Sequence, residues 1–157
     1  MPRIFPVRIP VAAGDIDGNE HVNNLAYLRW MQEAAWAHSS AQGWTPQRYR
    51  ELGAGWFVRS HFIEYLRPAH LGDVLMLHTW VGEMKAGSCV RRFLFLPEAG
   101  REAIARAQTR WAFVDLDSGR PRRIPFEVSS AFPIVPDNDP EFAALLPDAR
   151  ADRRAAD

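Results

Sequence analysis

The sequence predicts one α+β domain in which a mainly antiparallel sheet wraps around a long central helix. The chain has 157 residues, a length that suits a single domain of roughly 100 to 200 residues. One long helical pattern occupies its first third, and consecutive extended runs separated by turns follow. Short connections between consecutive strands favour antiparallel pairing. A helix that is apolar almost all round needs a sheet to cover it.

The first third contains one extended segment, a polar loop and the helix. Residues 4–11 are β-prone, and the loop spans residues 13–23. We expect the helix over residues 24–42, with Asn23 or Asn24 as N-cap, because asparagine accepts a hydrogen bond from the free N–H groups of a first turn. Most of the circumference is apolar, so we expect the helix to be buried on nearly all sides. Its narrow polar stripe consists of Arg29, Gln32, Glu33 and Trp36.

Four further extended runs are expected after the helix. They span residues 56–66, 74–81, 89–96 and 103–115, and turn signals rich in glycine or proline separate them. The last run alternates apolar and polar residues, as a strand with one dry and one wet face requires. Its dry side consists of Ala105, Ala107, Thr109, Trp111 and Phe113.

The composition changes near the end of the chain. We expect residues 1–132 to form the domain and residues 133–157 to be a peripheral segment, because proline and acidic residues become frequent beyond Phe132. The last residues, 149–157, are small or charged. Such a composition predicts disorder.

Charge and composition exclude several classes of protein. The 19 basic residues balance 19 acidic ones, so charge does not favour nucleic-acid binding. No apolar run reaches the length of a membrane-spanning helix, and the N-terminus lacks the pattern of a signal peptide. Cys89 is the only cysteine, which leaves no internal disulfide and no paired-cysteine metal site. We therefore expect a soluble, cytoplasmic protein that contacts no membrane and needs no metal.

The densest cluster of reactive groups lies directly before the predicted helix. It reads Gly14-Asp15-Ile16-Asp17-Gly18-Asn19-Glu20-His21-Val22-Asn23-Asn24. A helix start presents unpaired N–H groups and the positive end of the helix dipole, which can polarise a carbonyl and stabilise an oxyanion. A carboxylate beside it can attack that carbonyl or activate water. This loop is the first candidate for the chemistry.

The same residues carry a resemblance to a known family. Asp15-Ile16-Asp17 and His21-Val22-Asn23-Asn24, followed by Tyr27-Leu28-Arg29-Trp30 and Glu33-Ala34, resemble the signature of hotdog-fold acyl-CoA thioesterases, in the 4-hydroxybenzoyl-CoA thioesterase-like branch. The resemblance covers about residues 4–132 and implies a hotdog fold. It also implies an enzyme that hydrolyses acyl-CoA to a free acid and CoA without a cofactor. It also implies a homodimer or homotetramer with active sites between protomers.

The resemblance assigns roles within the loop. It implies that Asp17 is the nucleophile or general base, and that the backbone N–H of Asn24 polarises the thioester carbonyl. The spacing of Asp17, Asn19 and His21 also resembles acyl-ACP thioesterases, in which these three positions have catalytic or orienting roles. Asn19 and His21 are therefore further catalytic candidates.

Two departures from these patterns bear on His21. The 4-hydroxybenzoyl-CoA enzymes carry no histidine at this position, and the acidic residue that acyl-ACP thioesterases add on the next strand is replaced near Pro68 and Ala69. His21 either transfers a proton or only orients the loop, and the sequence leaves both roles open. Asp15 is expected to cap the turn rather than to react.

Four weaker candidates concern substrate binding. Tyr27 belongs to the signature, and Trp30 could line an acyl tunnel, although aromatic residues on a buried helix are usually core. Arg91 and Arg92 could bind CoA phosphates through bidentate hydrogen bonds. A solvated strand face explains the two arginines equally well.

Two other functions remain open. The chain could hydrolyse acyl-ACP, as the spacing of Asp17, Asn19 and His21 indicates. It could also bind acyl-CoA without hydrolysing it, since a fold alone does not prove catalysis. The intact Asp17 argues against this second alternative.

Overall fold

A five-stranded sheet is the central element of the computed structural model, which describes residues 3–146. Its strands are β1 (Phe5–Pro10), β2 (Ala54–Tyr65), β3 (Val74–Met84), β4 (Ser88–Pro97) and β5 (Ala105–Asp115). They lie in the order β1-β3-β4-β5-β2, and every neighbouring pair is antiparallel. All five predicted strands are confirmed, with ends shifted by a few residues. Pro6 and Pro10 fit β1 because it is an edge strand, where missing N–H donors are tolerated.

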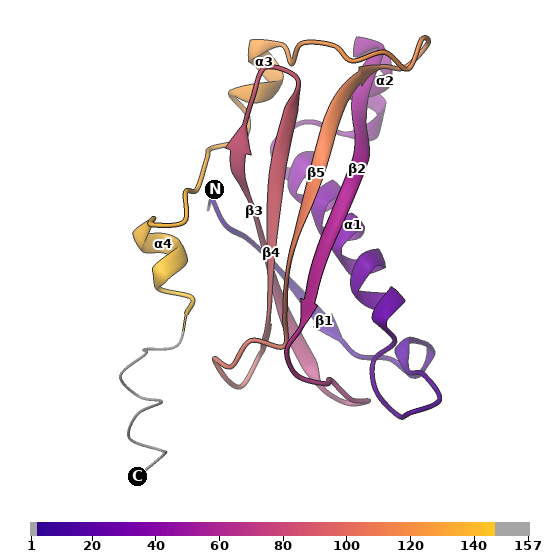
Figure 1. The fold of residues 1–157 in the computed structure, drawn as a ribbon, viewed down its shortest axis with the longest axis vertical. Coiled ribbons are helices and arrows are strands. Elements are labelled where there is room, and N and C mark those ends of the chain that lie inside the picture. Colours follow the sequence, from indigo (N-terminus) through magenta and orange to yellow (C-terminus); the bar gives the residue numbers. More distant parts are fainter. Residues whose placement is uncertain (1–2, 147–157) are drawn as a thin grey trace.

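The long helix α1 spans Asn24–Ala41, as predicted, and runs along one face of the sheet (Figure 1). The shorter helices are η1 (Ala13–Asp15), α2 (Pro46–Leu52), α3 (Phe126–Ser129) and α4 (Pro140–Ala143). The helix α2 was not predicted, although the sequence contains its start and stop signals. Thr45 caps its N-terminus, Pro46 occupies its first turn, and Gly53 ends it in the left-handed conformation with φ of 75°.

The main core lies between α1 and the inner face of the sheet. Phe95 of β4 is fully buried there, and its ring packs edge-on against Tyr27 with the centroids 5.1 Å apart. The ring of Trp30 lies 6.4 Å from that of Phe95. Other fully buried residues of the inner face include Leu75, Leu77, Phe93 and Phe113. Burial of these side chains holds α1 against the sheet.

The prediction that α1 is buried on nearly all sides is wrong for the single chain. The predicted polar stripe is exposed, but so are Ala37 and Leu25, the latter by 70%. The helix is therefore amphipathic: the sheet covers its inner side, and its outer side is exposed in the single chain. Its apolar outer positions look like core positions in the sequence, because the pattern reports hydrophobicity and not the presence of a neighbour.

The outer face of the sheet carries a second, smaller apolar cluster. Trp80, Leu94 and Leu96 pack there with Ile4 and with the fully buried Val135. The segment after residue 132 thus crosses the outer face, on the side away from α1 (Figure 1). The predicted disordered residues, 149–157, lie outside the described range. No helix within residues 3–146 is long and apolar enough to cross a membrane.

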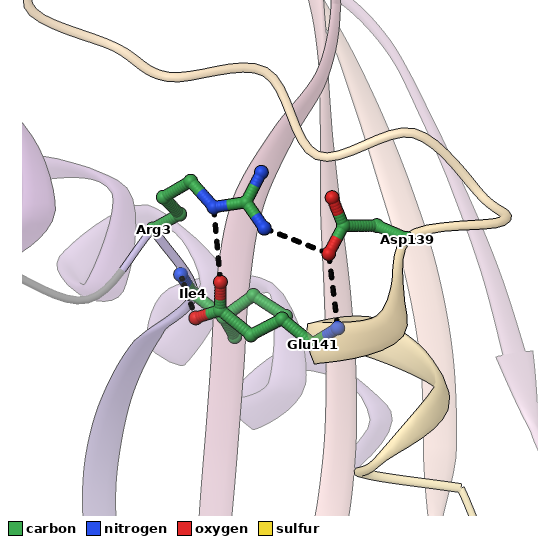
Figure 2. Close-up of polar contacts among 4 residues, drawn as sticks. All are labelled: Arg3, Ile4, Asp139 and Glu141. Atoms are coloured by element: carbon green, nitrogen blue, oxygen red, sulfur yellow. Dashed lines mark hydrogen bonds and ion pairs between the residues drawn. The ribbon is translucent and has the colours of Figure 1, made fainter.

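A polar clasp, formed by Arg3, Ile4, Asp139 and Glu141, fastens this segment to the N-terminus (Figure 2). Arg3 donates to Asp139 at 2.7 Å and to Glu141 at 3.1 Å. The backbone N–H of Ile4 donates to the other carboxylate oxygen of Glu141 at 3.2 Å. Asp139 also caps α4 by accepting the N–H of Glu141 at 2.9 Å.

Replacing Phe95 with alanine tests the packing of α1 on the sheet. We expect Phe95→Ala to lower the free energy of unfolding by about 3–5 kcal/mol, because it leaves a cavity beneath the helix. The same change at Phe126, which is 84% exposed, should cost less than about 0.5 kcal/mol. Urea unfolding of both variants measures the difference, and equal losses would contradict this description of the core.

Candidate active site

A tight turn holds the carboxylate of Asp17. One oxygen, Oδ1, accepts the backbone N–H of Asn19 at 2.8 Å and that of His21 at 3.2 Å. The backbone N–H of Asp17 donates to the carbonyl of His21 at 2.8 Å, which closes the turn. Glu20 adopts a positive φ of 63° to complete it. Among the described residues, the second oxygen, Oδ2, accepts no hydrogen bond, so it is available to a substrate or a water.

Asp15 anchors the loop instead of facing solvent. Its side chain is buried, accepts the N–H of Ala12 at 2.9 Å and forms an ion pair with Arg29 of α1. Burial raises the pKa of Asp15, but the hydrogen bonds from Ala12 and Arg29 together lower it below the usual aspartate value. The two aspartates of the motif therefore differ. Asp15 ties the loop to the helix, whereas Asp17 keeps one carboxylate oxygen free of hydrogen bonds.

The start of α1 lies beside this turn. The N–H of Asn23 donates to the carbonyl of Asp15 at 2.7 Å, and its side chain caps the helix by accepting the N–H of Leu25 at 2.9 Å. Tyr65, at the end of β2, donates to the carbonyl of Asn24 at 3.1 Å. In the part of the chain that the structure describes, the backbone N–H of Asn24 has no acceptor. A free N–H at a helix start is the donor that an oxyanion needs.

The loop between β2 and β3 contacts the turn that holds Asp17. The carbonyl of Ala69 accepts the N–H of Val22 at 2.8 Å. The exposed ring of His21 lies edge-on to that of His70, with the centroids 5.1 Å apart. His70 in turn lies 3.8 Å from the carboxylate of Asp73. His70 and Asp73 were not predicted to lie at this site, because nothing in the local sequence indicates that they fold against a loop fifty residues earlier.

Among the catalytic candidates, Asp17, Asn19 and His21 lie in one loop, and Asn24 is the first residue of α1 directly after it. Asn19 contacts Asp17 through its backbone, and its exposed side chain makes no hydrogen bond within residues 3–146. The catalytic roles of these residues stay predictions.

The four substrate-binding candidates lie apart from one another. Tyr27 and Trp30 are buried in the core, and burial raises the pKa of Tyr27 to about 12. Arg92 faces the outer side of the sheet, where it pairs with Asp137. Arg91 faces the inner side and is buried under α1. Because they lie on opposite faces of β4, the two arginines cannot hold one phosphate group together, and their binding roles stay predictions.

The arrangement suits attack on an activated carbonyl. A carboxylate with one fixed and one free oxygen lies in the turn before a helix whose first N–H has no acceptor. Cys89 offers no competing nucleophile, because burial raises the pKa of its thiol to about 12 and keeps it protonated.

Known proteins resemble this chain in sequence and in fold. The family model of the thioesterase-like superfamily matches residues 11–132. The acyl-CoA thioesterase YbgC of Haemophilus influenzae is 30% identical over 131 residues, which cover 82% of this chain and 92% of that protein.

Two solved structures show the same fold. The 1,4-dihydroxy-2-naphthoyl-CoA thioesterase from Synechocystis superposes with a TM-score of 0.76 at 22% identity, covering 82% of this chain and 95% of its own. The 12:0-ACP thioesterase from Umbellularia californica also gives 0.76, at 19% identity, covering 90% of this chain and 58% of its own. The match to the family model extends over most of the chain and includes the whole loop before α1. The chain therefore belongs to the thioesterase-like superfamily and has its hotdog fold.

Proposed function

We propose that this thioester hydrolase acts on acyl-CoA in the cytoplasm, with Asp17 as its nucleophile or general base. The observation that carries the proposal is the carboxylate of Asp17, with Oδ1 held by two N–H groups and Oδ2 free, beside the unbonded N–H of Asn24. The similarity to an acyl-CoA thioesterase at 30% identity supports CoA as the carrier. The lone Cys89 fits a reducing compartment.

Two routes use the same atoms. In the first, Oδ2 of Asp17 attacks the thioester carbon, the C–S bond breaks, CoA leaves as a thiolate, and water hydrolyses the resulting anhydride. In the second, Oδ2 takes a proton from a water that attacks the thioester carbon, and the C–S bond then breaks to release CoA as a thiolate. In both, negative charge develops on the carbonyl oxygen, and the N–H of Asn24 stabilises it. In this proposal, His21 either orients the loop or protonates the leaving thiolate.

We also propose that the chain forms a homodimer or homotetramer. The strand β2 is twelve residues long and lies at an edge of the sheet, with one side pairing β5. Phe57 and Phe62 on this strand are 57% and 58% exposed. A long edge strand with exposed aromatic side chains favours pairing with a second copy. An exposed Leu25 at the start of α1 adds apolar surface close to the active-site loop.

The alternative carrier is ACP. The spacing of Asp17, Asn19 and His21 favours it, and one structural relative is a 12:0-ACP thioesterase. Comparing the turnover of one acyl chain on CoA and on ACP decides between the two carriers. A higher kcat/KM on ACP would identify acyl-ACP as the substrate.

Replacing Asp17 with asparagine tests the proposed chemistry. Asparagine keeps the shape and can accept the same two N–H groups, but it is neither a nucleophile nor a base. We expect Asp17→Asn to reduce kcat at least about a thousandfold with an unchanged melting temperature. The measurement is release of free CoA from short, long and aromatic acyl-CoAs. Arg110→Gln, an exposed change on β5, is the matched control and should keep full activity.

Wild-type hydrolysis that persists in Asp17→Asn would contradict the role of Asp17. No hydrolysis of any acyl-CoA or acyl-ACP by the wild type, combined with tight acyl-CoA binding, would identify a binding protein instead.

The pKa of Asp15 predicts a loss of stability in acid. A carboxyl group whose pKa is lower in the folded state stabilises the fold above its unfolded pKa, near 3.8, and this contribution disappears as the pH falls through the lower folded value. Asp15→Asn should therefore lower stability at pH 7 and flatten its dependence below pH 4. Urea unfolding from pH 2 to pH 7 measures both effects. A wild-type slope retained in the variant would contradict this role.

Sedimentation tests the proposed oligomer. We expect a mass of two or four times 17.8 kDa. Replacing both Phe57 and Phe62 with lysine should shift the protein toward the monomer, because charges on an edge strand oppose pairing. The same number of new charges at exposed sites away from β2, in Phe126→Lys with Ser118→Lys, should leave the mass unchanged. A monomeric wild type would contradict the proposal.

A further inference from the structure

Arg91 is a buried cation that the proposed hydrolysis does not use. It lies on the inner face of β4 under the C-terminal half of α1, and only 5% of its surface is exposed. Burial lowers the pKa of its guanidinium to about 10, so it stays charged at neutral pH. Within residues 3–146, no carboxylate lies within ion-pair distance of it. A buried charge without a counter-ion is costly, and proteins rarely keep one without a use.

The groups that contact Arg91 are neutral. Its Nη1 donates to Nδ1 of His38 at 2.9 Å and to the hydroxyl oxygen of Thr79 at 3.1 Å. Burial, together with the charge of Arg91, lowers the pKa of His38 to about 3, so this imidazole is uncharged. The hydroxyl of Thr79 donates a hydrogen bond to the carbonyl of Arg92 at 3.0 Å, so the hydroxyl oxygen acts as the acceptor for Arg91. None of these groups supplies the missing negative charge.

The unused hydrogen-bonding groups around Arg91 are donors. Its two described hydrogen bonds both start from Nη1, so Nε and Nη2 remain, and these form one side of the fork that fits a carboxylate. The indole N–H of Trp111, a neighbouring residue that is 8% exposed, has no acceptor within residues 3–146. Within residues 3–146, Nε and Nη2 of Arg91 and the indole N–H of Trp111 therefore have no acceptor, and a negatively charged acceptor would also balance the buried charge.

A pocket provides access to this cation. It lies between α1 and the sheet and opens to solvent, and Arg91 is the one charged side chain among the residues that line it. Its walls are mainly apolar and include Trp56, Met84, Trp111 and Phe132. Trp36, at 39% exposure, also contributes to the lining. An apolar pocket with one convergent charged group is the usual form of a small-molecule site.

We propose that this pocket binds a carboxylate carried on a short apolar body, with Arg91 as its counter-ion. The apolar walls take up the body, and the free side of the guanidinium takes the carboxylate through two parallel hydrogen bonds. The lining residues Ala35 and Ser39 lie roughly 16 Å or more along α1 from Asn24, at 1.5 Å per residue. Within one protomer the pocket is therefore separate from the loop of Asp17.

The carboxylate can come from two sources. One is a free acid, the class of product that thioester hydrolysis releases. The other is the far end of an acyl group that itself carries a carboxylate, reaching the pocket across a protomer boundary. The second source rests on the proposed function, and the first does not.

Calorimetric titration of the full-length protein tests the free-acid source. Hexanoate and benzoate are the probes, and hexanamide and benzamide are their neutral counterparts. We expect the wild type to bind the acids and not the amides. Arg91→Lys keeps a charge but loses the fork, and should weaken binding at least tenfold. Arg91→Met should abolish it, and Arg106→Met, an exposed change on the neighbouring strand β5, should leave it unchanged.

The second source is tested with thioesters on the Asp17→Asn protein, so that binding is measured without turnover. Glutaryl-CoA, which ends in a carboxylate, is compared with valeryl-CoA. If the acyl group supplies the carboxylate, glutaryl-CoA binds at least tenfold tighter, and Arg91→Lys removes the difference.

Arg91-dependent binding in either arm supports the proposal. The proposal would be overturned if neither arm showed it, that is, if each arm gave no binding, equal binding of the charged and neutral ligands, or wild-type affinity in Arg91→Lys. The free-acid arm involves no hydrolysis, so a failure of the proposed activity leaves its result interpretable.

Discussion

The packing of α1 against one face of the sheet is the constraint on which both candidate sites depend. Phe95 holds the first half of the helix through Tyr27 and Trp30, which fixes where the helix begins. That beginning fixes the loop, because the N–H of Asn23 is bonded to Asp15. The second half of the same helix covers Arg91 through His38. One apolar contact surface thus positions the carboxylate of Asp17 at one end of the helix and the buried guanidinium of Arg91 at the other.

The sequence predicted the five strands, α1 and the loop before it, because each of these depends on local periodicity or on adjacent residues. It did not predict how much of α1 is covered, since apolar residues such as Leu25 look the same in a core and on a surface. The short helix α2 was missed despite its capping residues, because seven residues give too little periodicity to outweigh the turn signals around them.

The residues of the candidate site also divide into those that the local sequence indicates and those that only the fold brings together. Asp17, Asn19, His21 and Asn24 lie within eight residues, so one motif could indicate all of them. His70 reaches the loop only through the fold, by way of the bond between Val22 and Ala69. The surroundings of Arg91 depend on three separate elements, and no spacing along the chain could have indicated that a strand arginine lacks an acidic partner. Non-local chemistry of this kind becomes visible only in three dimensions.

The clasp of Arg3 with Asp139 and Glu141 has a consequence for the order in which the fold is completed (Figure 2). Its partners are separated by more than 130 residues, so closing it fixes a very long loop, which is slow compared with forming neighbouring hairpins. During synthesis, β3, β4 and β5 leave the ribosome before α4 does. The apolar outer face around Trp80 and Leu94 therefore stays uncovered on the growing chain until Val135 and the residues that follow it have been made.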